Sequence, residues 1–247
     1  MPRRSTKKKD NILVPDLDEL AVYSNSMQHI KPITDSQKKA YDCWEKGNNL
    51  ILSGAAGSGK TFIAIYLALQ ELINNRKKRL VILRSVVPTR DIGFLPGTQE
   101  EKEAAYLTPY IGVVSEIFNN NPSLFTSFIK NGTIEFLTTS YIRGITLKNA
   151  IVVVDEFQNC NFHELDSIIT RIGKGSRVIF SGDYYQSDFT NRKEKEGIGE
   201  FLKIIECLKH FEKIEFDWKD CVRSGMVRDY LMTKEKMIED NTVNIPK

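Results

Sequence analysis

The sequence predicts an α/β fold in which a mostly parallel β-sheet is covered by helices on both faces. Short apolar runs alternate along the 247-residue chain with segments of helical periodicity. The runs are continuously apolar, which is typical of parallel strands that are buried on both faces. A glycine-rich loop joins the first run to the next helix, and ligands in such folds bind beyond the carboxyl ends of the strands.

Six apolar runs are the predicted strands. They are rich in Val, Ile, Leu and Phe and are bounded by polar or turn-forming residues. They lie at 49–54, 80–84, 133–138, 150–156, 176–183 and 213–216. If these strands are parallel, their carboxyl ends meet at one edge of the sheet. We therefore expect the chemistry to follow residues 54, 84, 138, 155 and 182.

The segments between the strands are predicted helices. They cover 34–46, 61–75, 98–130, 162–172, 199–210 and 223–240. Thr34 or Asp35 is suited to cap the first of them. The long third segment is expected to break near Pro109 and Pro122, because proline cannot donate the helical hydrogen bond. The proline- and glycine-containing stretch 85–97 is predicted to be a loop.

The chain is expected to form one domain with two tails. Residues 1–30 show little periodicity, and five of the 35 basic residues lie within the first nine positions. We predict a basic, flexible segment over 1–30 that either assists binding of a nucleic acid or other polyanion or is simply solvated. Residues 31–240 form the predicted folded domain, and 241–247 form a C-terminal tail.

Cysteine usage and hydropathy predict a cytoplasmic protein. The four cysteines are widely spaced and include no CxxC pair, so reduced thiols are expected instead of a metal site or a disulfide framework. No stretch approaches the roughly 20 consecutive apolar residues of a membrane helix. The N-terminus lacks the apolar core of a secretory signal. We expect no membrane partner.

The segment GAAGSGKT at 54–61 matches the phosphate-binding motif G-x-x-x-x-G-K-[ST] at every position. Its glycines let the backbone curl so that successive N–H groups point inward, and the following helix adds the positive end of its dipole. Lys60 can reach the β- and γ-phosphates of a nucleotide, and the Thr61 hydroxyl can ligate Mg²⁺. The sequence therefore predicts a single P-loop NTPase domain of the RecA-like type. Its nucleotide-binding residues are Gly54, Ala55, Ala56, Gly57, Ser58, Gly59, Lys60 and Thr61.

Two adjacent carboxylates end the fourth apolar run, as they do in a Walker B strand. Asp155 is expected to hold Mg²⁺, and Glu156 is placed to polarise the attacking water. Gln186 follows the fifth strand and has an amide that can contact a γ-phosphate or orient water; a simple turn at the strand end is the alternative. Together these residues predict an enzyme that hydrolyses ATP with Mg²⁺ as its cofactor.

Six pieces of the chain, taken in order, resemble the PhoH-like proteins. They are Gln37, GAAGSGKT at 54–61, RSVVPTRDIGFLPG at 84–97, YIRGITLKNAIVVVDEFQN at 141–159, TRIGKGSRVIFSGDYYQSD at 170–188 and VRS at 222–224. The most specific of these are GFLPG at 93–97 and DEFQN at 155–159. PhoH-like proteins are P-loop ATPases related to the motor core of superfamily 1 helicases, and they occur in bacteria and phages. The resemblance runs from about residue 32 to about residue 232. It implies ATP hydrolysis coupled to RNA binding or remodelling, and the short form suits a phage copy.

The resemblance also implies roles for single residues. Thr34 and Gln37 match a motif whose glutamine reads the adenine edge. Gln186 matches the γ-phosphate sensor, and Arg223 looks like an arginine finger, which stabilises charge in the transition state. The implied catalytic residues are Glu156, Lys60, Gln186 and Arg223, and the implied metal ligands are Thr61 and Asp155.

Arg84 and Arg143 match family arginines near the active face, where phosphate relay, RNA contact and structural pairing all remain open. The chain also departs from the family pattern. Phe157 replaces the alanine of the usual DEAQ, and Ile145 stands where a second arginine is common. The change at Ile145 weakens the case for an RNA contact in that loop.

Two other functions fit the same loop. A small-molecule kinase would use 85–97 as a lid, but Glu156 and Gln186 favour water as the acceptor. A nucleotide-dependent switch or binding module with little turnover has no need of a base such as Glu156. A superfamily 1 motor pairs two such domains, so we expect a homo-oligomer, such as a ring. In it, Arg223 of one subunit would face the nucleotide of the next, with single-stranded RNA as a partner.

Overall fold

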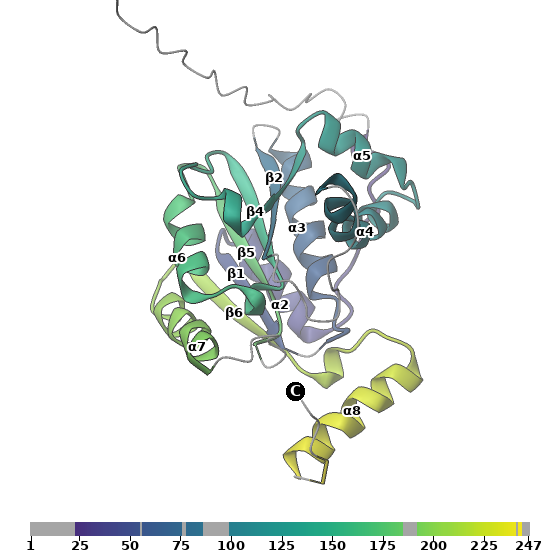
Figure 1. Ribbon diagram of the computed structural model, residues 1–247. Helices are drawn as coiled ribbons and strands as arrows, with labels where there is room; N and C mark the ends of the chain where they lie inside the picture. Colours follow the sequence, from purple (N-terminus) through teal and green to yellow (C-terminus); the bar gives the residue numbers. More distant parts are fainter. Residues whose placement is uncertain are drawn as a thin grey trace, which may run out of the picture.

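The computed structural model describes residues 23–54, 56–75, 78–85, 99–184, 192–240 and 242–243. Its centre is a six-stranded sheet in the order β3-β2-β4-β5-β1-β6, and every neighbouring pair is parallel (Figure 1). The strands are β1 (Asn49–Gly54), β2 (Arg79–Arg84), β3 (Ile134–Thr138), β4 (Ala150–Asp155), β5 (Arg177–Gly182) and β6 (Phe211–Phe216). The predicted α/β fold class and all six predicted strands are confirmed.

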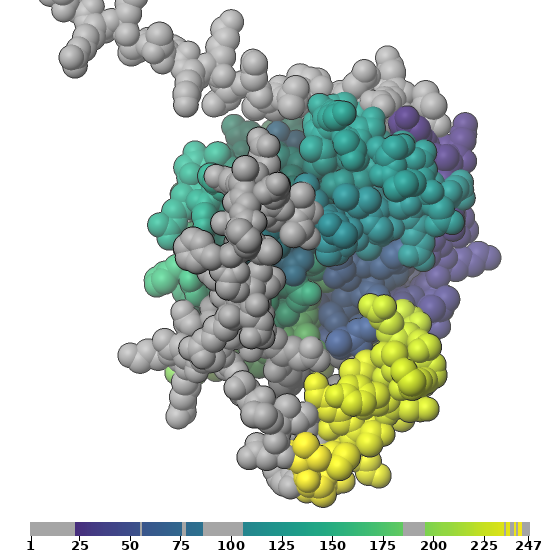
Figure 2. Space-filling view, turned by 45° about the vertical axis from the view of Figure 1, so that its right-hand side comes forward, coloured from purple at the N-terminus to yellow at the C-terminus, as the bar shows by residue number. Residues whose placement is uncertain are grey.

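Helices cover both faces of the sheet (Figure 1). One face carries α2 (Asp35–Glu45), α3 (Lys60–Asn74), α4 (Gln99–Ile117) and α5 (Ser123–Lys130). The other face carries α6 (Phe162–Arg171) and α7 (Arg192–Glu206). The helix α8 (Gly225–Glu239), yellow in Figures 1 and 2, lies at the lower end of the molecule, apart from the sheet. No helix within the described ranges is both long and apolar enough to cross a membrane.

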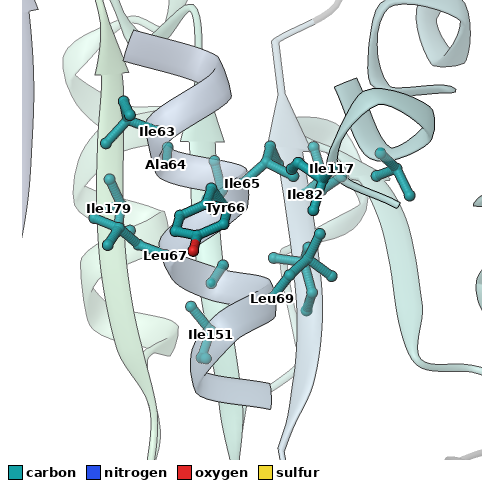
Figure 3. Close-up of a cluster of buried hydrophobic side chains, with 14 of the residues drawn as sticks. Ile63, Ala64, Ile65, Tyr66, Leu67, Leu69, Ile82, Ile117, Ile151 and Ile179 are labelled. Carbon is teal, nitrogen blue, oxygen red and sulfur yellow. The ribbon is translucent and has the colours of Figure 1, made fainter. Parts of the chain in front are cut away.

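The helix α3 is deeply buried on its face of the sheet, and this burial holds Lys60 and Thr61 at its N-terminus. Figure 3 shows its side chains packed against Ile151 and Ile179 of the sheet and against Ile82 and Ile117. Burying one such side chain stabilises the fold by roughly 1.5–3 kcal/mol. A helix held on several sides cannot shift easily, so the first residues of α3 have a fixed position relative to the sheet.

The strand order places the predicted chemistry in one crevice. The strand β5 lies between β1, which carries the phosphate loop, and β4, which carries the acidic pair. Asp155 is in register with Ser181, and Ser53 is in register with Gly182. The ends of three strands therefore meet side by side, as expected for a ligand site at the carboxyl edge of a parallel sheet.

The helices differ from their predicted bounds in two places. The helix α4 continues through Pro109, where a break was expected, because Tyr110, Val114 and Ile117 are fully buried and hold the helix in place despite the lost hydrogen bond. The helix α7 begins at Arg192 instead of residue 199. Its first turns are polar, so they show no apolar periodicity in the sequence. The predicted break near Pro122 is confirmed, because α5 starts at Ser123.

Candidate active site

A cavity of about 920 Å³ opens at the carboxyl ends of β1, β4 and β5. This volume lies within the range of small-molecule sites in proteins. Among its lining residues, those predicted from the sequence are Gln37, Ala56, Gly57, Gly59, Lys60, Thr61, Glu156 and Arg223. Two predicted site residues, Ala55 and Gln186, lie outside the described residues. The structure therefore brings most of the predicted site into one place.

The phosphate loop has the backbone that its glycines allow. Gly57 and Gly59 have φ angles of 76° and 80°, in the left-handed region. Lys60 begins α3, and its ammonium donates to the backbone oxygen of Gly54 at 2.8 Å and to the Ser58 hydroxyl at 3.3 Å. Burial lowers the pKa of Lys60, while neighbouring carboxylates such as Asp155 oppose that shift. The lysine is thus held across the loop, next to the place where phosphates would bind.

The carboxylate of Asp155 is held from two sides. The Thr61 hydroxyl donates to its Oδ1 at 2.8 Å, and the Tyr110 hydroxyl donates to its Oδ2 at 2.9 Å. Asp155 is only 4% exposed. Burial, and then the charge of Glu156, raise its pKa, whereas these two hydrogen bonds and the positive charge of Arg84 act in the opposite direction.

The donor set around Thr61 fits Mg²⁺. A hydroxyl and a carboxylate are the hard oxygen ligands that this ion prefers. The Thr61 proton points to Asp155, so the lone pairs of its oxygen remain for the metal. No group of three His, Cys, Asp or Glu side chains within the described ranges could hold a metal by itself. Mg²⁺ here would take its other ligands from phosphates and water, as is usual for this ion.

Glu156 has an unusual backbone. Its φ and ψ are 52° and 43°, the left-handed region, which costs a non-glycine residue on the order of 1–3 kcal/mol. Its carboxylate accepts a hydrogen bond from the amide of Gln158, and the other end of that amide accepts from the Asp183 N–H at 3.0 Å. A Cβ at Gly182 would lie 2.1 Å from the Gln158 oxygen, so a side chain at this position would displace Gln158. Gln158 therefore ties the predicted base to the end of β5.

Gln37 connects the segment before α2 to the phosphate loop. Its side-chain oxygen accepts from the Ile33 N–H at 3.0 Å, and its amide nitrogen donates to the Ser58 backbone oxygen at 3.4 Å. Thr34 caps α2 by accepting from the Gln37 N–H. Each amide atom of Gln37 keeps the capacity for one further hydrogen bond, which an adenine edge could use.

Arg223 lies against the phosphate loop of its own chain. The Val222 N–H donates to the Gly57 backbone oxygen at 3.0 Å. A Cβ at Gly57 would lie 2.8 Å from Cγ of Arg223, so a side chain at this glycine would collide with the arginine. Arg223 therefore lies beside the phosphate loop. Its service to the nucleotide of a neighbouring subunit stays a prediction.

Arg84 and Arg143 lie in different places relative to the cavity. Arg84, at the end of β2, lines the cavity, and its Cζ lies 5.8 Å from the centroid of the Tyr106 ring. Arg143 is exposed and is not among the residues that line this cavity. Sequence reasoning missed two site residues, Tyr110 and Gln158. Gln158 had a signal in the DEFQN motif, whereas Tyr110 follows a proline that predicted only a helix break.

This sheet, a phosphate loop that leads into α3 and an acidic pair beyond β4 together define a P-loop NTPase. A family model described as PhoH-like protein matches residues 29–234. The chain belongs to the PhoH-like family. The predicted resemblance is therefore confirmed, and with it the general class of P-loop ATPases.

Individual relatives agree with this membership. The chain is 32% identical over 219 residues to the PhoH-like protein of Synechocystis sp., covering 88% of this chain and 66% of that protein. It is 32% identical over 178 residues to Protein PhoH of Escherichia coli K12, covering 72% and 50% respectively. It therefore spans about half to two thirds of the length of these relatives. The structure of unliganded Pif1 from Bacteroides sp. is also similar, with a TM-score of 0.43 at 17% identity, over 88% of this chain and 47% of Pif1.

Proposed function

We propose that this chain binds Mg²⁺-ATP, hydrolyses it to ADP and phosphate, and couples hydrolysis to the binding or remodelling of RNA. The observation that carries the proposal is the hydrogen bond from Thr61 to Asp155, with Glu156 beside it and facing the cavity of the phosphate loop. A metal position and a general base next to the γ-phosphate are the two requirements for activating water.

Each residue has a defined task in this reaction. The N–H groups of the phosphate loop bind the phosphate oxygens, and Lys60 turns from the Gly54 oxygen to the β- and γ-phosphates. Mg²⁺, when bound, neutralises phosphate charge. Glu156 accepts the proton of the attacking water as the new oxygen–phosphorus bond forms and the bond to ADP breaks. Arg223 stabilises the charge that develops on the phosphates, and Gln186 is the proposed γ-phosphate sensor.

The geometry supports an enzyme more than a passive nucleotide holder. The left-handed backbone at Glu156 is unfavourable by on the order of 1–3 kcal/mol. The amide of Gln158 donates a hydrogen bond to the Glu156 carboxylate and orients it. A switch with little turnover needs neither feature. That switch is the second candidate function, and a small-molecule kinase is the third. Both functions use the same phosphate loop, but in neither does Glu156 accept a proton from an attacking water.

The RNA partner and the oligomer are supported by surface features. Tyr141 is 58% exposed and Arg143 is also exposed, on the segment that follows β3 at the same sheet edge as the cavity. An aromatic ring and a guanidinium on one surface suit stacking on single-stranded bases and pairing with phosphates. We propose a homo-oligomer because related motors use two such domains. The four free cysteines support a cytoplasmic location.

The test is phosphate release from ATP with Mg²⁺, with and without single-stranded RNA. We expect Glu156→Gln to lose about 10²- to 10⁴-fold in turnover while still binding ATP. Glu200→Gln, an exposed position on α7, is the matched control and should behave as wild type. RNA-stimulated turnover supports the full proposal, and turnover indifferent to RNA removes the RNA partner. ATP binding without turnover in the wild type would leave only the switch.

A further inference from the structure

Tyr110 is a buried polar residue that no motif accounts for. It lies on α4 and is 0% exposed, and its hydroxyl donates to Oδ2 of Asp155 at 2.9 Å. The two residues are 45 positions apart and come from different elements. A hydroxyl buried to this degree needs a partner, and a charged partner makes the hydrogen bond about twice as strong as a neutral one.

Arg84, at the end of β2, lies near both Tyr110 and Asp155. Its positive charge acts against the rise that burial causes in the pKa of each of these two groups. The hydrogen bond from the Tyr110 hydroxyl to Asp155 is thus made in the neighbourhood of a cation that also lines the cavity.

We propose that Tyr110 is a positioning residue for the metal: its hydroxyl holds one carboxylate oxygen of Asp155 so that the other stays turned toward Thr61. The inference rests on the proposed function and deepens it by adding a residue to the Mg²⁺ site. Thr61 alone cannot fix the carboxylate, because it holds only Oδ1 and leaves Oδ2 free to turn about that contact. Two anchors, one on each oxygen, stop the carboxylate from rotating about its last bond.

The contact also makes α4 part of the nucleotide site. The helix α4 supplies Tyr106 beneath Arg84 and Tyr110 beside Asp155. Residues that orient a metal ligand from outside the coordination shell typically change metal affinity by about 10- to 100-fold. Loss of the Tyr110 hydroxyl should therefore weaken metal binding much more than nucleotide binding itself.

The experiment compares Tyr110→Phe with wild type in titrations of a fluorescent methylanthraniloyl-ATP, with and without Mg²⁺. We expect affinity without Mg²⁺ to stay within about twofold, and the gain in affinity on adding Mg²⁺ to fall by about tenfold. Tyr41→Phe is the matched control, since it removes a hydroxyl that donates to the Ile30 backbone oxygen at 3.1 Å. This control should keep the full Mg²⁺-dependent gain.

The outcomes separate the two levels of inference. An undiminished Mg²⁺-dependent gain in Tyr110→Phe overturns the role of Tyr110 and leaves the proposed function intact. No such gain in the wild type overturns the proposed function, and the role of Tyr110 with it. If Tyr110→Phe does not fold, Tyr110→Met removes the same hydroxyl with a more adaptable side chain. It should reduce the gain by a similar factor, and an unchanged gain would again contradict the proposal.

Discussion

Two inactive variants, mixed together, can decide which nucleotide Arg223 serves. Lys60→Ala removes the phosphate-binding cation but keeps Arg223, and Arg223→Ala does the reverse. If Arg223 acts on its own chain, no subunit of a mixed oligomer has a complete site. Arg223 lies beside the phosphate loop of its own chain. The Val222 N–H donates to the Gly57 backbone oxygen at 3.0 Å, and Cγ of Arg223 would lie 2.8 Å from a Cβ at Gly57. We therefore expect no recovery of activity on mixing.

The magnitudes make the two outcomes easy to tell apart. Loss of an arginine finger lowers turnover by about 10³-fold or more, so each variant alone is nearly silent. If the arginine served a neighbour, a complete site would need an Arg223→Ala subunit holding ATP and a Lys60→Ala subunit beside it. In an equimolar mixture this combination arises at about a quarter of the sites, because each condition is met half of the time.

The assay is phosphate release after the two variants have been unfolded together and refolded. Differently tagged copies that purify together show that subunits have mixed, and a parallel refolding of wild type with Lys60→Ala shows that assembly tolerates the variant. Recovery toward a quarter of the wild-type rate would refute the same-chain placement. Activity that stays at the level of the separate variants, in proven mixed oligomers, would support it.

Three further predictions concern stability and the orientation of Glu156. Asp155→Asn should raise the melting temperature of the nucleotide-free protein, because burial raises the pKa of Asp155 and its charge opposes folding. This opposition is present above the raised pKa and fades as pH falls through it, so the gain should shrink as the pH is lowered through that pKa. A gain that is the same at every pH in thermal scans would contradict this. Gly182→Ala should displace the Gln158 side chain, because the added Cβ would collide with its oxygen. The variant should lose about 1–3 kcal/mol of unfolding free energy in urea titrations and have lower turnover. Full activity would show that Gln158 does not orient Glu156. Asn161→Ala should cost about 1 kcal/mol of unfolding free energy with little effect on nucleotide affinity, because it removes the capping box with Glu164 at the start of α6.

Features that depend on short contiguous stretches were predictable from the sequence. Runs such as 150–155 are apolar throughout because parallel strands are covered on both faces, and this composition alone locates them. The phosphate loop was predictable for a similar reason, since its backbone geometry requires a fixed spacing of glycines before Lys60 and Thr61. The same logic placed Asp155 at a strand end.

Features that depend on contacts between distant elements were not predictable. The hydroxyl of Tyr110 finds Asp155 only because α4 packs beside α3, and nothing in the local sequence of α4 records that neighbour. The local rule at Pro109 predicted a break, yet tertiary packing keeps the helix continuous. Likewise, the position of Arg223 beside the phosphate loop depends on how the segment after β6 returns to Gly57.

The backbone at Glu156 explains how two consecutive carboxylates can take different tasks. In a continuing strand, neighbouring side chains point to opposite faces of the sheet, so only one of the pair could face the nucleotide. The left-handed turn at Glu156 ends the strand at Asp155. Asp155 then points toward Thr61 and Tyr110, while Glu156 faces the cavity and contacts Gln158. The left-handed backbone at Glu156 therefore directs the proposed metal ligand and the proposed base to different places. Because the two negative charges are adjacent and repel each other, each carboxylate needs its own hydrogen-bond donors.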